Sequence, residues 1–250
     1  MLRAERVLAP NPGPMTLDGT NTWVLREPGG RSAVVVDPGP EDGAHLARVA
    51  AFGPIAAILL THGHADHSGG ARRFSEITGA PVRALDPRHR YGGEGLAEGD
   101  LVAVDGLELR VIATPGHSAD SLCFALPADR AVLTGDTVLG RGTSVVAYPD
   151  GRLGDYLGSI RRLRALADDG VDVLLPGHGP VVSSAASVLD FYLAHRAERL
   201  AQVQAAVDAG VREPAAVVRQ VYADVDPSLW PAAELSVRAQ LDYLEGHRRS

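Results

Sequence analysis

Short apolar runs separated by Gly and Pro occupy the chain between Arg6 and Pro180. Several of them are followed at once by polar residues, and apolar runs of this length between turn residues predict buried β-strands. The predicted strands are 23–25, 33–36, 55–60, 107–112, 122–126, 131–133 and 171–175.

Segments with helical spacing of apolar residues lie between some of these strands and fill the last quarter of the chain. The predicted helices are 43–51, 69–78, 153–167, 185–209, 214–223 and 231–245. Gly210 ends the long Ala-rich helix, and the Asp226-Pro227 turn precedes the last helix. We therefore predict an α/β domain over residues 1–195, with helices packed outside sheets, and a small helical subdomain over residues 196–250.

The composition is that of a water-soluble globular protein. Its 250 residues are 45% apolar and 22% charged, which excludes disorder and collagen-like repeats. The sequence has neither an apolar stretch long enough to span a membrane nor the apolar core of a signal peptide, so we expect a cytoplasmic protein with no membrane partner. The single cysteine, Cys123, forms neither an internal disulfide nor a cysteine-based metal cluster. Any metal must therefore be held by His, Asp and Glu.

The distribution of charge argues against a surface built to hold nucleic acid. The formal net charge is −7, whereas phosphate binding normally requires a basic patch. From His195 onward the chain has seven Arg and eight acidic residues. The C-terminal subdomain is therefore not a basic nucleic-acid arm, although a local basic groove stays compatible with these numbers.

The segment THGHADHSGG, residues 61–70, carries four candidate metal ligands directly behind an apolar run. Side chains two apart in an extended segment point to the same side, so His62 and His64 form a two-imidazole clip. Asp66 and His67 follow at the turn into a Gly-Gly helix start, where we expect them to point towards a neighbouring position.

Three further segments have the same order of strand, glycine and candidate ligand. They are ATPGHSADS with His117, LTGDTVLG with Asp136 and LLPGHGP with His178. Imidazole and carboxylate are ligands that zinc, iron and manganese accept from a protein. We therefore predict a metal site built from these positions and the 61–70 segment, with two zinc ions as the expected cofactors and iron or manganese as alternatives.

The sequence resembles the metallo-β-lactamase superfamily, whose five motifs occur here in order between about Asn11 and Pro180. They are Asp37 in VVVDPGP, the HxHxDH cluster at 62–67, His117, Asp136 and His178. The resemblance implies a four-layer αββα sandwich with a dinuclear site at one edge of its two sheets. It implies that His62, His64 and His117 hold one metal, that Asp66, His67 and His178 hold the second, and that Asp136 bridges both. Asp37 would then orient a ligating imidazole without binding metal.

The segments NPGPMTLDGTNTWVL, GRGTSVV and HRAERL resemble the β-lactamase-like protein 2 branch and its bacterial relatives. That branch implies a winged-helix-like subdomain at residues 196–250. The family implies hydrolysis, with a metal-bridging hydroxide as the nucleophile and Asp66 as the catalytic group that orients it and accepts its proton. A carboxylate at Asp136, where drug-resistance β-lactamases usually have cysteine, argues against that activity.

Two substrate classes stay open. For single-stranded RNA, animal members of the branch cleave such RNA, and phosphate contacts could come from Arg72, Arg73, Arg141, Arg196 and Arg199. For a small-molecule or acyl-carrier thioester, or another carboxylic ester, fungal relatives cleave acyl groups from carrier proteins, and Met15, Leu17, Trp23 and Val145 offer an apolar lining. A binding-only role, or a redox role with iron, is disfavoured because every ligand position is filled and no flavin-binding segment is attached. Neither the substrate-binding residues nor the oligomeric state can be read from the sequence.

Overall fold

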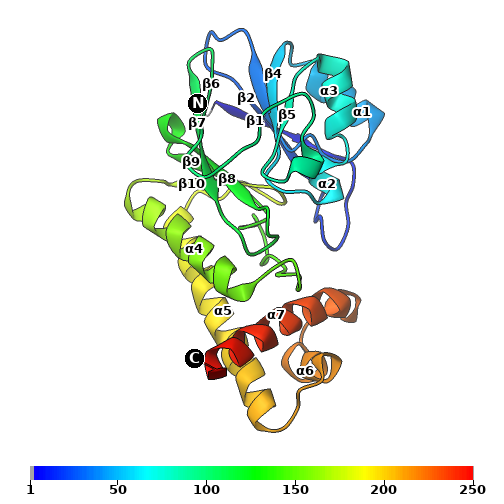
Figure 1. The fold of residues 1–250 in the computed structure, drawn as a ribbon, viewed down its shortest axis with the longest axis vertical. Helices are drawn as coiled ribbons and strands as arrows, with labels where there is room; N and C mark the ends of the chain where they lie inside the picture. Colours follow the sequence, from blue (N-terminus) through cyan, green and yellow to red (C-terminus); the bar gives the residue numbers. More distant parts are fainter. Residues whose placement is uncertain (1–2, 250) are drawn as a thin grey trace.

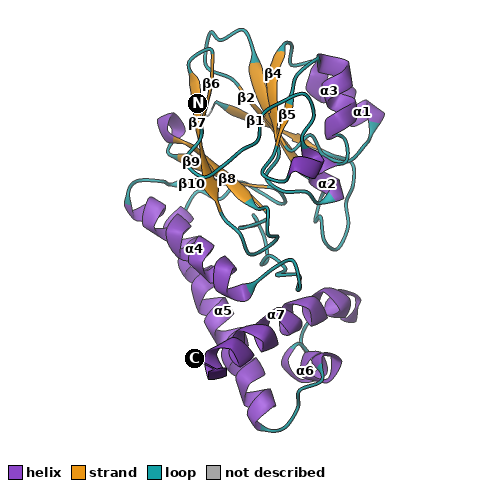
Figure 2. Cartoon of the chain, in the orientation of Figure 1, coloured by secondary structure: helices purple, strands orange, loops and turns teal. Residues whose placement is uncertain are grey.

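The computed structural model describes residues 3–249 and contains two five-stranded sheets packed face to face (Figures 1 and 2). The first sheet has the order β1-β2-β3-β4-β5, in which the β1–β2 and β2–β3 pairs are antiparallel and the β3–β4 and β4–β5 pairs are parallel. Its strands are β1 (Ala4–Leu8), β2 (Asn21–Leu25), β3 (Ala33–Val36), β4 (Ile55–Leu59) and β5 (Val82–Arg83).

The second sheet has the order β10-β9-β8-β7-β6, with β10 and β9 parallel and all other neighbours antiparallel. Its strands are β6 (Leu101–Val104), β7 (Leu107–Ala113), β8 (Leu122–Leu126), β9 (Ala131–Gly135) and β10 (Val173–Pro176). Each sheet therefore contains parallel strands whose carboxyl ends share one edge.

The core consists of three apolar layers, which explain the strand and helix patterns of the sequence. Between the sheets, residues such as Leu25, Val36 and Phe124 are fully buried. On the outer face of the first sheet lie the helices α1 (Gly43–Ala50), α2 (Ala65–Ser68) and α3 (Ala71–Thr78), and on that of the second lie α4 (Leu153–Asp168) and α5 (Ala185–Asp208) (Figure 1). The result is the predicted αββα sandwich.

The C-terminal part is helical and has its own small core. The second half of α5 packs on α6 (Pro214–Val221) and α7 (Trp230–Arg249) through side chains that include Val203, Val217 and Val237. Single 3-10 turns lie at Pro87–His89, Pro127–Asp129 and Pro227–Leu229. An ion pair between Arg152 and Asp242, at 3.1 Å, joins the start of α4 to α7. This helical part therefore sits against the sandwich at the end where α4 begins (Figure 1).

The fold confirms the predicted sandwich with its C-terminal subdomain, but three strands were not predicted. The segments β1, β5 and β6 were missed because three of the residues of β1 and two of those of β6 are exposed and β5 has only two residues. The helix predicted at 69–78 is wrong at its start: Asp66 and His67 lie in the separate short helix α2, and α3 begins only at Ala71. Because α5 is continuous through residues 195 and 196, the division of the chain there stays a proposal.

Among the described residues, no helix combines the length and the apolar character that crossing a membrane requires.

Candidate metal centre

The candidate ligands come together because each of them follows the carboxyl end of a strand. The 61–70 loop follows β4, whereas His117, Asp136 and His178 follow β7, β9 and β10 of the second sheet. Hydrogen bonds join the loops of the two sheets at this edge: the Leu122 amide donates to the Thr61 carbonyl at 2.7 Å, and the Asn21 amide donates to the Gly177 carbonyl at 2.7 Å. The two sheets thus hold the loops against each other.

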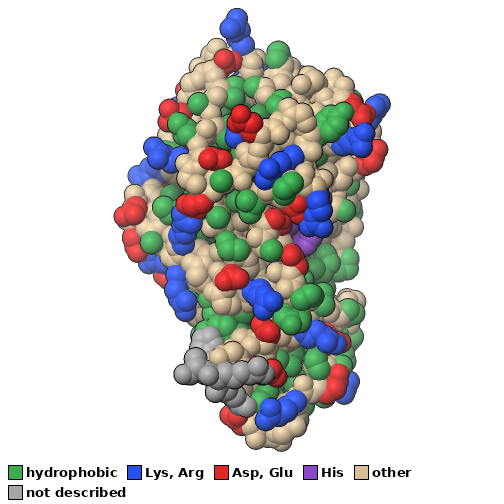
Figure 3. Space-filling model, in the orientation of Figure 1, with side chains coloured by type: hydrophobic (Ala, Val, Ile, Leu, Met, Phe, Trp, Pro, Cys, Tyr) green, Lys and Arg blue, Asp and Glu red, His purple; other side chains and the backbone are tan. Residues whose placement is uncertain are grey.

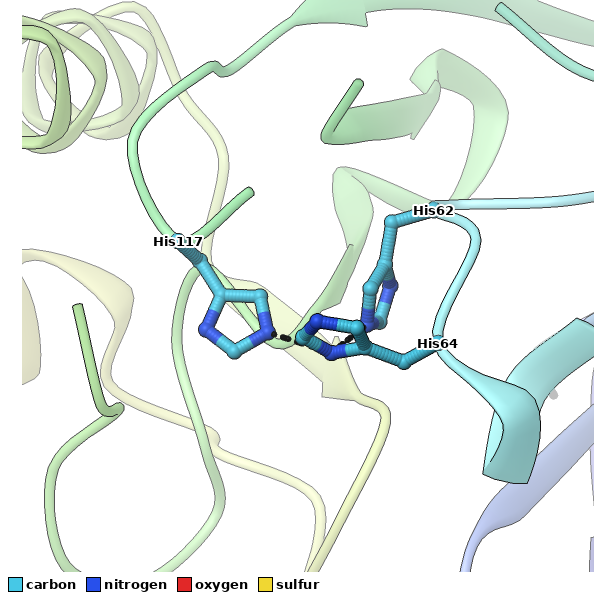
Figure 4. Close-up of side chains that lie close together, drawn as sticks. All are labelled: His62, His64 and His117. Carbon is cyan, nitrogen blue, oxygen red and sulfur yellow. Dashed lines mark hydrogen bonds between the residues drawn. The ribbon is translucent and has the colours of Figure 1, made fainter. Parts of the chain in front are cut away.

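Three imidazoles form a first group at this edge. Figure 4 shows the rings of His62, His64 and His117 pointing toward one another from two different loops. Nε2 of His62 lies 3.0 Å from Nδ1 of His64, and Nε2 of His117 lies 3.1 Å from the same Nδ1. Three ring nitrogens therefore converge on one point, and they belong to the set that the family resemblance assigns to one metal.

A second group contains Asp66, His67 and His178. Nε2 of His67 lies 3.2 Å from Nε2 of His178. The Oδ2 atom of Asp66 lies 3.3 Å from the first of these nitrogens and 3.1 Å from the second. Asp66 and His67 thus face a neighbouring position, as the turn after His64 predicted.

Asp136 lies between the two groups. Its Oδ2 atom is 3.3 Å from Nε2 of His178 and 3.8 Å from Nε2 of His117, and its Oδ1 atom is 3.4 Å from Nε2 of His67. The carboxylate therefore reaches both groups from the end of β9.

Hydrogen bonds on the outer ring nitrogens fix which nitrogen faces inward. Nδ1 of His117 donates to the Val145 carbonyl at 2.7 Å, and Nδ1 of His178 donates to the Gly19 carbonyl at 3.2 Å. Since Nδ1 of each ring donates to a carbonyl, Nε2 is the nitrogen left to bind a metal at the centre of the group.

Asp37 extends this support to both groups. Its Oδ2 atom accepts hydrogen bonds from Nδ1 of His67 at 2.8 Å and from the Thr61 hydroxyl at 2.6 Å, and its Oδ1 atom accepts from the Thr61 amide at 2.8 Å. The Thr61 hydroxyl in turn lies 2.9 Å from Nδ1 of His62. Because the hydroxyl proton is given to Asp37, its oxygen accepts from His62. One buried carboxylate therefore orients an imidazole in each group.

The electrostatics of the centre favour cations. Burial alone lowers the pKa of His67, but the charges of Asp136 and Asp37 outweigh burial and hold that pKa well above its usual range. Burial also acts on His178, yet hydrogen bonds with Asp136 and Asp66 raise its pKa to about 9. The protons on these imidazoles occupy the place of a cation, and a metal ion binding there replaces them.

The arrangement fits metal ions on three further observations. Ligand nitrogens about 2.0–2.1 Å from one tetrahedral zinc ion lie roughly 3.3 Å apart, and the closest nitrogen pairs here are separated by 3.0 to 3.2 Å. Oδ1 of Asp136 is buried without a hydrogen-bond partner among the described residues. A Cβ at Gly177 would lie 2.6 Å from that same atom and from Cε1 of His67, so the glycine leaves room for the ligands.

A cleft of about 290 Å³ opens beside the centre, between the sandwich and the C-terminal helices. Its walls include His117 and Asp136 on one side and Tyr222, Val225 and Ala233 on the other. Figure 3 shows hydrophobic side chains gathered where the lower, helical part meets the sandwich, and the outline is notched there. A substrate bound in this cleft would contact both parts of the chain.

The sequence named several lining residues, and the structure places most of them here. Met15, Leu17 and Val145 line the cleft. Trp23 does not: it is 3% exposed between the sheets, and its Nε1 donates to the Pro176 carbonyl at 3.0 Å. The assignment of Trp23 to the lining was wrong because its strand is buried on both faces.

Of the five arginines that the sequence offered as phosphate contacts, some line the cleft and some do not. Arg141, Arg196 and Arg199 line the cleft. Arg72 and Arg73 lie on α3, outside the residues that form the cleft, and both pair with Glu76 at 3.6 and 3.2 Å. Arg72 and Arg73 follow the 61–70 loop in sequence, but helix α3 carries their side chains outward.

Sequence reasoning gave no role to three residues that the structure places near the site. The Thr20 hydroxyl donates to Oδ2 of Asp66 at 3.3 Å. Thr20 lies in the NPGPMTLDGTNTWVL segment, which gave it no individual role. His195 lines the cleft. It begins the HRAERL segment, which gave it no individual role. His89 forms a separate surface group with Asp86 and Asp120, in which Asp86 is already paired with Arg88 at 2.5 Å.

Comparison with known families identifies the fold and its appendage. Residues 15–178 match the metallo-beta-lactamase superfamily, and residues 214–249 match the beta-lactamase associated winged helix domain. The chain belongs to the metallo-β-lactamase superfamily. Its described His and Asp clusters are consistent with a dinuclear metal site.

Similar proteins include fungal and animal ones. The lactamase-like protein nscB of Arthroderma gypseum is 34% identical over 203 residues, which are 79% of this chain and 62% of that protein. The atrochrysone carboxyl ACP thioesterase of Aspergillus fumigatus is 38% identical over 193 residues, 73% of this chain and 58% of that enzyme. The beta-lactamase-like protein 2 homolog of Caenorhabditis elegans is 36% identical over 207 residues, which are 78% of this chain and 67% of that protein. The chain thus spans about 60% of the length of the first two.

Among solved structures, a metallo-beta-lactamase family protein from Thermus thermophilus superposes with a TM-score of 0.82 at 23% identity. The superposition covers 98% of this chain and 94% of that one. It therefore includes both the sandwich and the C-terminal helices.

Proposed function

We propose that this protein is a dinuclear metal-dependent hydrolase of thioesters or related carboxylic esters. The observation that carries the proposal is that the candidate metal ligands His117 and Asp136 lie on the wall of a mainly apolar cleft. We call the sheet edge that bears the candidate ligands the ligand edge. An apolar cleft beside it suits the acyl group of a thioester. The 38% identical acyl-carrier thioesterase supports the same substrate class. In this proposal His62, His64 and His117 hold one metal and Asp66, His67 and His178 the other, with Asp136 shared. Bound metal ions would supply activation of water and polarisation of the scissile carbonyl.

Asp66 is proposed as the group that moves the proton. Its side chain is 28% exposed, against 11% for Asp136, so Asp66 is the more solvent-accessible of the two carboxylates at the centre. Burial tends to raise its pKa, but hydrogen bonds from His178 and His67 lower it far below the usual range. Asp66 is therefore ionised at neutral pH and carries no proton of its own. Its proposed role as acceptor of the water proton and donor to the leaving thiolate rests on its position at the centre, where bound metal ions would replace the protons of His67 and His178 that lower its pKa.

The acyl group of the substrate is proposed to bind in the cleft. Leu17, Leu139, Val145 and Leu229 contribute apolar wall, and apolar lining with a few polar groups is usual for small-molecule sites. Since His117 and Asp136 line the same cleft as these side chains, an acyl chain bound there has its carbonyl beside the candidate metal ligands.

RNA cleavage, the other substrate class open from the sequence, has less support. Arg72 and Arg73 lie away from the cleft and Arg196 is buried, so few of the five arginines can follow a phosphate backbone. Aromatic platforms for stacking bases are few, because only 5% of the residues are aromatic. The relative named beta-lactamase-like protein 2 homolog does not by its name distinguish the two classes.

The test compares substrates on the full chain reconstituted separately with zinc, iron(II) and manganese(II). Butyryl-N-acetylcysteamine, p-nitrophenyl butyrate and a fluorescent single-stranded RNA are offered to wild type, Asp66→Asn, His64→Ala and the control Asp42→Asn, whose carboxylate caps α1. We expect thioester hydrolysis that falls about a hundredfold or more in the first two variants and is unchanged in the control. RNA cleavage with the same dependence on the variants, alongside inert thioesters, would replace the proposal.

A further inference from the structure

We infer that the cleft recognises an anionic group of the substrate through Arg199 and Arg141, at a subsite separate from the metal ligands. This inference rests on the proposed function, because it names the kind of thioester that the same site takes. The anion is a carboxylate or a phosphate, carried either by the acyl group or by the thiol leaving group.

The first observation is the charge of the cleft wall. Among the described residues that line it, three are arginines and Asp136 is the only acid. The whole chain has a formal charge of −7, so the wall is cationic in a molecule that is otherwise acidic. A site of this sign raises the local concentration of anionic ligands.

Arg199 is held in place as a ligand-binding guanidinium. Its Nη1 donates to the Val221 carbonyl at 2.7 Å and to Oε1 of Gln202 at 3.1 Å. Its guanidinium carbon lies 4.7 Å from the ring centroid of Tyr222, which also lines the cleft. Stacking on Tyr222 and the hydrogen bond to the Val221 carbonyl fix the plane of the guanidinium. A fixed guanidinium plane is the preorganisation that recognition of a carboxylate or phosphate requires.

The carboxylates that face these arginines are weak competitors. Arg199 contacts Asp224 at 3.5 Å and Arg141 contacts Asp18 at 3.4 Å, and both acids are more than half exposed. The exposed Arg141–Asp18 pair contributes little free energy. The Arg199–Asp224 pair is weak because its atoms are 3.5 Å apart and Asp224 is 72% exposed. A ligand anion that enters the cleft can therefore replace them at little cost.

Arg196 differs from the other two because the fold uses it. It is 7% exposed, lies over the Tyr156 ring at 4.9 Å and donates to the Ser144 carbonyl. Its charge adds to the positive potential of the wall, but its side chain is fixed between α5 and the 140–149 loop. The contacting role is therefore assigned to Arg199 and Arg141.

The experiment measures binding of non-hydrolysable thioether analogues by calorimetry on the metal-loaded full chain. Three probes are used: S-butyl-N-acetylcysteamine, which is neutral; S-(4-carboxybutyl)-N-acetylcysteamine, with a carboxylate on the acyl side; and S-butyl-4′-phosphopantetheine, with a phosphate on the leaving-group side. The proteins are wild type, Arg199→Gln, Arg141→Gln and the control Arg72→Gln. Arg141 is 59% exposed, so its variant keeps the inference testable if Arg199→Gln fails to fold.

We expect one anionic probe to bind at least tenfold more tightly than the neutral one, and this advantage to fall about tenfold or more in either cleft variant. The probe that shows the advantage identifies the source of the anion. Equal binding of all three probes, or an advantage that survives both cleft variants, overturns the inference. Binding of a single-stranded oligonucleotide that depends on these arginines, with no preference among the thioethers, overturns it in favour of RNA.

Failure of the inference is separable from failure of the proposed function. Hydrolysis of neutral and anionic thioesters at equal rates by wild type and both cleft variants would remove the anion subsite and leave the hydrolase. Tight, arginine-dependent binding of an anionic thioether without hydrolysis of the matching thioester would leave the subsite and remove the proposed reaction.

Discussion

The carboxylate of Asp37 accepts a hydrogen bond from Nδ1 of His67 at 2.8 Å, and both side chains are almost completely buried. Through the Thr61 hydroxyl the same carboxylate also fixes Nδ1 of His62. One residue thus controls the ring direction of an imidazole in each candidate ligand group. Partners of this kind raise the basicity of a ligand and hold its tautomer.

Replacement of Asp37 is therefore expected to weaken metal binding in both groups. Asp37→Asn keeps the side-chain shape and tolerates the positive φ of 52° at this position, but it removes the charge. We expect metal affinity to fall about tenfold to a hundredfold, measured by competition with a chromophoric chelator. Asp42→Asn serves as the control. Unchanged affinity in Asp37→Asn would show that Asp37 does not support the ligands.

Gly177 is expected to tolerate no side chain. A Cβ there would lie 2.6 Å from Oδ1 of Asp136, so Gly177→Ala must displace that carboxylate or the strand end that carries it. We expect at least a tenfold loss of metal affinity and about 1–3 kcal/mol of lost stability from overpacking. Metal content by mass spectrometry and a denaturant titration measure the two effects.

The matched control is Gly158→Ala on α4, where an added Cβ meets nothing within 4 Å. Alanine is the better helix former by about 1 kcal/mol, so this variant should keep its metal and gain stability. Full metal content in Gly177→Ala would contradict the crowding argument.

The metal-free protein is expected to lose stability as the pH rises through about 9. The folded pKa of His178 is raised to about 9 because hydrogen bonds with Asp136 and Asp66 outweigh its burial, and an unfolded imidazole titrates near 6.5. The stabilisation is fully present below the unfolded pKa and is lost as the pH rises through the folded one. Thermal melts of chelator-treated protein between pH 6 and 10 measure it. His178→Asn should reduce this slope and leave the part that comes from His67, whose pKa is also raised. A slope of the same size in that variant would assign all of it to other groups.

Metal uptake should release protons for the same reason. A metal ion replaces the proton on His178 and on His67, so apparent affinity rises with pH up to about 9. Calorimetry in buffers of different ionisation enthalpy counts the protons released near pH 7. Uptake without proton release would show that these imidazoles are neutral in the metal-free protein.

Cys123 should be unreactive in the folded protein. Burial raises the pKa of its thiol to about 11, and its Sγ lies 3.2 Å from the Thr114 hydroxyl inside the core. Because the thiolate is the reactive form, labelling by iodoacetamide at pH 8 is expected only after unfolding. Mass spectrometry of native and denatured samples distinguishes the two states. Rapid labelling of the native protein would mean that the second sheet opens locally.

Most of the local structure could be predicted from the sequence. The strand runs at 33–36 and 122–126 and the helix at 153–167 coincide with β3, β8 and α4 to within a residue, because their apolar periodicity and turn residues are local signals. The edges β1 and β6 were missed since an exposed edge strand carries a weak apolar pattern. Trp23 was wrongly assigned to the lining of the site, because the sequence does not show that the second sheet covers its side chain.

By itself the sequence determined the candidate ligands, since His and Asp behind glycine turns at strand ends are a local chemical signal, and it determined the superfamily through the order of those motifs. Only the tertiary structure decided that the Thr61 hydroxyl links Asp37 to His62 by hydrogen bonds. It also decided that Arg199 and Arg141 line the cleft beside the candidate ligands, whereas Arg72 and Arg73 lie outside it. These relations join residues far apart in the chain. They depend on how the two sheets and the C-terminal helices pack, and that packing leaves no pattern within any one segment.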